Sequence, residues 1–182
     1  QTEKYFVDYR EDIKNFFTLD SKLSEKGEII KNQIKNSQSV CISVRRGEYL
    51  TNPKFAKTHG FVGLDYYRKS IKKILKEVNN PHFFITSDEI EWCKKNIGDL
   101  LKGHQYTFLD DSCIVEDKYW QYLQLASRCK HFILSNSSFA WWLAWLGERD
   151  DSIIIAPEKW FADSNYQNNA SDIIPDRWIK IE

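Results

Sequence analysis

The sequence has no long hydrophobic run and no excess of charge of either sign. Its apolar stretches all fall short of the ~18 residues that a membrane-spanning helix needs, and no signal peptide is visible. The 182-residue chain carries 26 basic and 26 acidic residues, which gives a formal net charge of +0. Because proteins that bind nucleic acid normally present a net basic surface, this balance argues against a nucleic-acid partner.

The motifs of several common enzyme classes are also missing. The chain contains no GxGxxG, no GxxxxGK[ST] and no GxSxG, which argues against dinucleotide, P-loop and nucleophile-elbow sites. Its four cysteines form no CxxC or zinc spacing, and no two histidines stand at helical spacing, so we expect no metal and no cofactor. Cys41 and Cys129 fall inside apolar runs, which is typical of small core residues in a reducing compartment.

Short β-branched and apolar runs alternate with amphipathic segments along the chain. The predicted strands are 39–44, 82–86, 104–109, 131–134 and 152–156, with a further strand or strap at 178–181. The predicted helices between them include 64–78, 117–130 and 139–146. This order predicts an α/β fold, a Rossmann-like parallel sheet with flanking helices and right-handed crossovers.

Three regions outside this alternation have weaker patterns. Residues 9–17 predict an amphipathic helix, and 21–36 a second helix in which Gly27 is a candidate break. Residues 50–63 show no periodicity and are expected to form a long loop over a site. We therefore divide the chain into a helical connection (1–38), a Rossmann-like unit (39–161) and a tail that straps back on it (162–182). The helix at 117–130 is expected to turn Trp120 inward.

Polar side chains follow the first four strands at their carboxyl ends. They are Arg45, Arg46 and Glu48; Ser87, Asp88 and Glu89; Asp110 and Asp111; and Ser135, Asn136, Ser137 and Ser138. In a parallel sheet these ends share one edge, which is where ligands of open α/β sheets bind. Helix capping or a solvated turn explains each set singly, but two arginines facing a hydroxyl-rich helix start would form a diphosphate clamp. The joint placement favours an anionic-nucleotide site.

The segment 129–147, CKHFILSNSSFAWWLAWLG, has the most distinctive pattern in the chain. An apolar strand leads into a polar turn and then into an aromatic-rich helix. Unpaired backbone N–H groups at such a helix start can bind an anion. The alternative is an ordinary N-cap provided by Ser137 or Ser138.

Several segments, in order, resemble motifs of the bacterial α-1,2-fucosyltransferases of glycosyltransferase family 11. VRRGEY is similar to HxRRxD, FFITSDEIEWCKKN to a segment with SDD before a Trp-containing helix, and CKHFILSNSSFAWWLAWL to CKHxIxxNSxFSWWxAWL. The opening QTEKYF resembles an internal QSEKYF, and IIAPEKWF the last motif. The resemblance implies a GT-B-type enzyme of two Rossmann-like domains, of which this chain is the donor-binding half, with an acceptor domain upstream of residue 1.

The resemblance also implies an activity and a set of site residues. The reaction would be inverting transfer of L-fucose from GDP-β-L-fucose to the 2-OH of a terminal β-galactoside, without a metal. The acceptor would be an oligosaccharide or glycolipid, met in the cytoplasm or at the inner face of the membrane. Arg45, Arg46 and Glu48 are the expected catalytic residues, with Arg45 on the β-phosphate. The expected donor-binding residues are Arg45, Arg46, Ser87, Asp88, Glu89, Asp110, Asn136, Ser137, Ser138 and Phe139.

Three positions depart from the family pattern. Ser43 stands where the first motif usually has His, Glu48 where it usually has Asp, and Tyr122 where related sequences often have an acid. That His and an acid help to read guanine in related enzymes, so Asp110 or Asp111 is expected to substitute here. Glu48 is a candidate general base, and pairing with an arginine is the alternative. Two other functions stay open, namely a transferase of α-1,6 linkage and a non-catalytic nucleotide-sugar-binding module.

Overall fold

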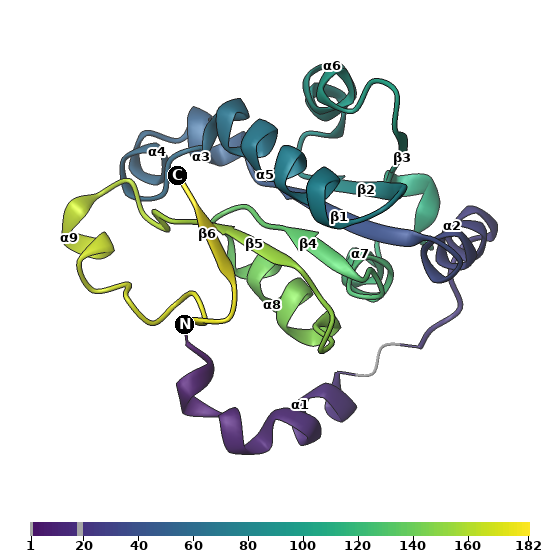
Figure 1. Ribbon diagram of the computed structural model, residues 1–182, viewed down its shortest axis with the longest axis horizontal. Helices are drawn as coiled ribbons and strands as arrows, with labels where there is room; N and C mark the ends of the chain where they lie inside the picture. Colours follow the sequence, from purple (N-terminus) through teal and green to yellow (C-terminus); the bar gives the residue numbers. More distant parts are fainter. Residues whose placement is uncertain (1, 18–19) are drawn as a thin grey trace.

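A six-stranded, wholly parallel sheet runs through the molecule (Figure 1). The structure, a computed structural model, describes residues 2–17 and 20–182. The strands are β1 (Gln38–Val44), β2 (Pro81–Ser87), β3 (Gln105–Phe108), β4 (His131–Ile133), β5 (Ile154–Pro157) and β6 (Ile179–Ile181). Their order is β3-β2-β1-β4-β5-β6, and each neighbouring pair is parallel. This confirms the predicted α/β, Rossmann-like class, and the expected strap at 178–181 contributes the edge strand β6.

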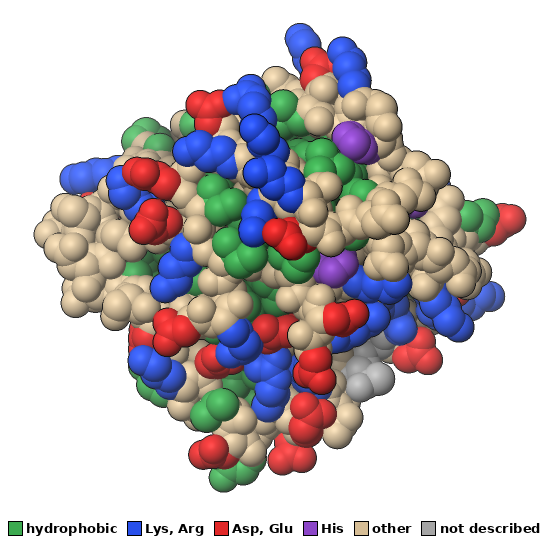
Figure 2. All heavy atoms as spheres, in the orientation of Figure 1, with side chains coloured by type: hydrophobic (Ala, Val, Ile, Leu, Met, Phe, Trp, Pro, Cys, Tyr) green, Lys and Arg blue, Asp and Glu red, His purple; other side chains and the backbone are tan. Residues whose placement is uncertain are grey.

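Helices cover both faces of the sheet. They are α1 (Arg10–Phe16), α2 (Glu25–Lys35), α3 (Gly47–Thr51), α4 (Pro53–Thr58), α5 (Gly63–Glu77), α6 (Ile90–Leu100), α7 (Trp120–Ala126), α8 (Ser138–Gly147) and α9 (Ser164–Gln167). In Figure 1, α5 and α6 lie on one face, and α2, α7 and α8 on the other. No helix within the described part of the chain is long and apolar enough to cross a membrane. Acidic and basic side chains are scattered over the face seen in Figure 2.

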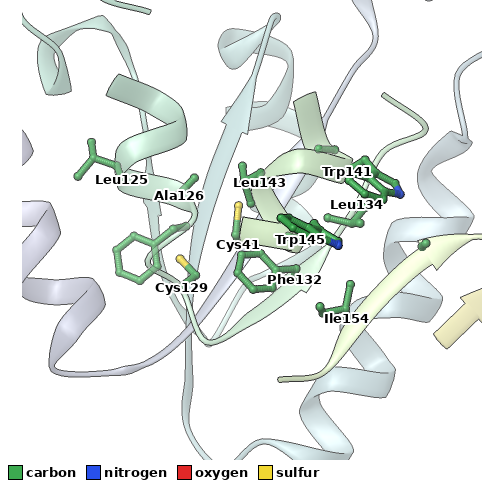
Figure 3. Packing of buried hydrophobic residues seen from close by; sticks show 14 of the residues in the cluster. Cys41, Leu125, Ala126, Cys129, Phe132, Leu134, Trp141, Leu143, Trp145 and Ile154 are labelled. Carbon is green, nitrogen blue, oxygen red and sulfur yellow. The ribbon is translucent and has the colours of Figure 1, made fainter. Parts of the chain in front are cut away.

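The strands divide the core because successive side chains point to opposite faces of the sheet. On β1, Val40 and Ile42 pack toward α5 and α6, whereas Cys41 packs toward α8. Figure 3 shows Cys41 beside Phe132 and the indole rings of α8, in the cluster that also holds Cys129. All four cysteines are free and buried, as the apolar context of Cys41 and Cys129 predicted.

The expectation that Gly27 could break the second helix is wrong. Helix α2 runs through Gly27, which is buried within it. A Cβ at this position would lie 2.3 Å from the carbonyl oxygen of Cys113 and 2.9 Å from the Cβ of Leu23. The glycine therefore allows close packing of α2 on the segment after β3, and it does not end the helix.

The expectation of a structureless loop at 50–63 is also wrong. Helices α3 and α4 occupy much of it, because the side chain of Asn52 caps α4 by accepting from the Lys54 N–H (3.0 Å) and Pro53 takes the first helical position. In α7, Trp120 is 43% exposed, against the expectation that it turns inward. The buried stripe of α7 includes Gln121 and Gln124, whose amides donate to Lys22 and Ser21 carbonyls.

A network of ion pairs joins the two ends of the chain to the carboxyl end of α8. Arg177 pairs with both Glu3 and Glu148, and Arg10 reaches Glu148 at 2.5 Å and Glu3 at 3.3 Å. The indole N–H of Trp145 donates to Glu3 at 2.9 Å. The N-terminal segment is thereby fixed against α8 and against the tail that leads into β6.

Candidate active site

A cavity of about 560 Å³ opens at the carboxyl edge of β1, β2 and β4. Six residues expected at the donor site line it: Arg45, Ser87, Asp88, Ser137, Ser138 and Phe139. Seven further lining residues come from strand ends, α3, the segment after β3 and the region of α7: Ser43, Val44, Tyr49, Thr86, Asp111, Tyr119 and Tyr122. The parallel topology brings these segments together, as the shared strand edge predicted.

Arg45 supplies the positive charge of the cavity wall. Its Nη1 lies 3.3 Å from Asp88 Oδ2, and its Nη2 lies 3.1 Å from Glu48 Oε2. The Arg45 side chain stays 36% exposed, so a ligand in the cavity can reach it. Glu48 is 59% exposed, and a half-exposed ion pair of this kind contributes little, so a phosphate can compete for the guanidinium.

Arg46 turns away from the cavity. Its guanidinium pairs with Glu89, and its Cζ lies 4.7 Å from the ring centre of Trp92. Neither Arg46 nor Glu89 belongs to the cavity lining. The two adjacent arginines therefore do different things, since Arg45 lines the cavity and Arg46 joins the end of β1 to the start of α6.

Asp88 organises the turn between β1 and α3. Its two carboxylate oxygens accept hydrogen bonds from the backbone N–H groups of Arg46 and Gly47, each at 3.0 Å. A Cβ at position 47 would lie 2.9 Å from Asp88 Oδ2, so glycine permits this close approach. Asp88 holds the backbone that carries Arg45 and also pairs with its side chain, which fixes the arginine in place.

The N-terminus of α8 forms another part of the cavity wall. Ser137 is the N-cap, and its Oγ accepts from the Ala140 N–H at 3.2 Å. Ser138 is exposed and lines the cavity together with Phe139. Because a helix start carries unpaired N–H groups and a partial positive charge, this wall adds to the positive potential of Arg45 and favours an anion in the cavity.

Asn136 lies behind this wall and outside the cavity lining. Its amide nitrogen donates to the carbonyl oxygens of His59 (2.9 Å), Gly60 (3.1 Å) and Trp160 (3.1 Å). The side chain is buried, and it ties the turn before α8 to two other loops. Its position supports the site from behind.

The two adjacent aspartates also diverge. Asp110 lies outside the cavity lining, where Lys26 contacts it at 3.0 Å and the Ser112 N–H donates to it at 3.2 Å. Burial alone would raise the pKa of Asp110, but the hydrogen bonds from Ser112 and Lys26 lower it. Asp111 lines the cavity and accepts a hydrogen bond of 2.7 Å from the Tyr122 hydroxyl. Burial and the neighbouring Asp111 carboxylate raise the pKa of Tyr122.

Tyr49 and Tyr119 are lining residues that the sequence reasoning missed. Tyr119 is 59% exposed at the mouth of the cavity. The tyrosines at 119 and 122 stand three apart around the start of a helix, which is a signal for a shared face. Within the described residues, no group of three His, Cys, Asp or Glu side chains is arranged to hold a metal ion.

Comparison with known proteins identifies the family. The model of glycosyl transferase family 11 matches residues 1–182, and the chain belongs to this family. An α-1,2-colitosyltransferase of Escherichia coli is 36% identical over 184 residues, covering 100% of this chain and 60% of the relative. The O-antigen biosynthesis glycosyltransferase WbnK of Escherichia coli is 32% identical over 149 residues, covering 81% and 46%. Human galactoside α-(1,2)-fucosyltransferase 1 is 32% identical over 155 residues, covering 80% and 41%.

These matches confirm the resemblance seen in the sequence motifs. They also show that the chain spans between 41% and 60% of the length of these curated relatives. The cavity described above therefore lies in a member of this glycosyl transferase family. The chain that forms it spans only part of the length of these relatives.

Proposed function

We propose that this chain is the donor-binding half of a GT-B-type, inverting α-1,2-fucosyltransferase. It would use GDP-β-L-fucose and the 2-OH of a terminal β-galactoside on an oligosaccharide or glycolipid. The observation that carries the proposal is that Arg45 and the N-terminus of α8 line the same cavity. Family membership and the human relative's name, galactoside α-(1,2)-fucosyltransferase 1, support the sugar and the linkage.

The chemistry of glycosyl transfer fits this arrangement. Breaking the bond between C1 of the sugar and the phosphate oxygen leaves its electron pair, and hence negative charge, on the β-phosphate of GDP. The guanidinium of Arg45 and the N–H groups at the start of α8 would stabilise that charge, which is the role a metal ion has in other transferases. Attack of the acceptor oxygen on the opposite face of C1 converts a β-linked donor into an α-linked product. Glu48, beside Arg45 and exposed, is the candidate base for the proton of the acceptor hydroxyl.

Asp111 is the best-placed residue to read the base. A carboxylate only accepts hydrogen bonds, and the edge of guanine offers two adjacent donors, N1–H and the 2-amino group. Adenine and uracil do not present this pair of donors. Tyr122 fixes Asp111 by a hydrogen bond of 2.7 Å, and the exposed ring of Tyr119 offers a stacking surface nearby. In this proposal Asp111 does the work that the usual His would do at position 43.

The test is calorimetric titration of this chain with GDP, IDP, UDP and ADP, with and without EDTA. We expect saturable binding that is selective for GDP and indifferent to EDTA. Asp111→Asn should abolish the preference for GDP over IDP, which lacks the 2-amino group, and Asp110→Asn is the matched control. The loss of one charged partner should reduce GDP affinity about 10- to 100-fold. Equal affinity of the unmodified chain for all four nucleotides would refute the assignment of GDP.

A second candidate is transfer of colitose instead of fucose. The α-1,2-colitosyltransferase that is 36% identical over the whole of this chain favours it. The two sugars can be separated by offering both nucleotide-linked donors to the enzyme in competition and measuring which one is consumed. Linkage analysis of the product then separates α-1,2 from α-1,6 transfer. If the full-length protein binds GDP but supports neither transfer nor donor hydrolysis, this chain would instead be a nucleotide-sugar-binding module.

A further inference from the structure

Tyr49 contacts two parts of the cavity wall that would face the phosphates, namely Arg45 and the turn before α8. Its residue is only 9% exposed, yet it lines the cavity. The Cζ atom of Arg45 lies over its ring, 5.6 Å from the ring centre. Its hydroxyl donates to the backbone carbonyl of Asn136 at 3.3 Å, in the turn that leads into α8.

A third segment closes this arrangement into a ring of contacts. The imidazole of His59 stacks on Tyr49, with ring centres 4.9 Å apart and an interplanar angle of 8°. The side-chain amide of Asn136 returns to the His59 carbonyl at 2.9 Å. Tyr49, Asn136 and His59 thus hold one another through a hydroxyl, an amide and a stacked pair, and they come from α3, the turn before α8 and the end of α4.

We propose that Tyr49 is a positioning residue, which sets the spacing between Arg45 and the N-terminus of α8. The inference rests on the proposed function, because it assumes that a nucleoside diphosphate binds between these two groups. Tyr49 touches Arg45 with its ring and the turn before α8 with its hydroxyl, so this lining residue contacts both groups. It acts on the phosphates through these two partners.

The physical reason is preorganisation. An anion site is strong when its donors already stand at the right separation, since the site then spends no free energy on reorganising as charge develops. The carboxylates of Asp88 and Glu48 form ion pairs with Arg45, and the aromatic face of Tyr49 restrains its guanidinium further. Without the ring, Arg45 gains rotamers that point away from α8.

Two variants separate the two contacts of Tyr49. Tyr49→Phe keeps the ring and removes the hydroxyl, and Tyr49→Leu removes the ring as well. We expect GDP affinity to fall about three- to tenfold in the first and about tenfold or more in the second. Binding of guanosine, which has no phosphate, should stay unchanged in both, because the base is held elsewhere. Tyr106→Phe, at the far edge strand β3, is the control and should bind both ligands as the unmodified chain does.

A double-mutant cycle tests whether Tyr49 acts through Arg45. GDP affinity is measured for Arg45→Lys, Tyr49→Leu and the double variant, with circular dichroism to establish that each is folded. Coupled residues give non-additive losses, so Tyr49→Leu should cost much less in the Arg45→Lys background. Additive losses, unchanged GDP affinity in Tyr49→Phe and Tyr49→Leu, or an equal loss of guanosine binding would each overturn the inference. Failure of the unmodified chain to bind GDP would instead refute the proposed function on which it rests.

Discussion

Replacing Arg45 by alanine should strongly lower the activity proposed above while leaving the fold almost intact. The guanidinium stands at the cavity wall and would contact the leaving phosphate, so its loss removes a charge-assisted contact in the transition state. Such a contact contributes about 2–4 kcal/mol, which corresponds to a loss of roughly 30- to 900-fold in kcat/KM. The stability cost should stay below about 1 kcal/mol because both ion pairs of Arg45 are partly exposed.

The neighbouring arginine supplies the contrast. Arg46 packs on Trp92 and pairs with Glu89 outside the cavity, so Arg46→Ala should lose about 1–2 kcal/mol of unfolding free energy. Its kcat/KM should fall far less than that of Arg45→Ala. The assay compares donor consumption by the two variants with their urea denaturation curves.

Asp88 allows the loss of the Arg45 side chain to be separated from damage to the turn that carries it. It keeps its hydrogen bonds to the Arg46 and Gly47 N–H groups when the Arg45 side chain is gone, so the turn itself should survive. An Arg45→Ala enzyme within threefold of normal kcat/KM would refute the assignment of Arg45 to the phosphate. The reverse ranking, with Arg46→Ala the less active variant, would show that the charge which matters lies on the other arginine.

Two further predictions concern the scaffold. Burial alone would raise the pKa of Glu148, but hydrogen bonds from Arg177, Arg10 and Trp178 lower it below the ordinary value of 4.5. The contribution of Glu148 to stability is therefore fully present above about pH 4.5 and is lost as the pH falls below that value. Glu148→Gln should flatten the acid side of a plot of unfolding free energy against pH. An unchanged slope would contradict this prediction. Gly27→Ala should cost about 1–3 kcal/mol in urea denaturation, since its Cβ would collide with the Cys113 carbonyl. The control Gly98→Ala, where the nearest atom is 3.7 Å away, should be neutral or stabilising, and equal effects at the two sites would contradict the packing argument.

Hydrophobic patterning was sufficient to predict the parallel sheet. Strands such as 39–44 are buried on both sides and read as continuous β-branched runs, and polar residues then mark their carboxyl ends. The sequence therefore located the edge where the cavity lies. It could not distinguish adjacent identical residues, because the direction of each side chain depends on the local backbone. Arg45 and Arg46 diverge in this way, and so do Asp110 and Asp111.

Two of the errors, at Trp120 and at Gly27, have their cause in tertiary contacts. Gln121 and Gln124 are buried because their amides find partners near Ser21, a pairing that no local pattern contains. A prediction from the apolar residues alone therefore gave α7 the wrong buried face and placed Trp120 inside the protein, where the structure leaves it exposed. The helix has glycine at position 27 because another segment of the chain passes close to it. The local sequence contains no sign of that neighbour.

The two ends of α8 connect distant parts of the molecule. Its first turn faces the cavity, and the residue that follows its last turn, Glu148, is held by Arg10 and Arg177. A ten-residue helix is only about 15 Å long and is stiff over that length. Buried packing of Trp141 and Trp145 and the hydrogen bond from the Trp141 indole to the Ile173 carbonyl hold this helix along its length, and Arg10 and Arg177 anchor its carboxyl end. In mechanical terms, residues near both ends of the sequence brace the helix whose first turn lines the cavity.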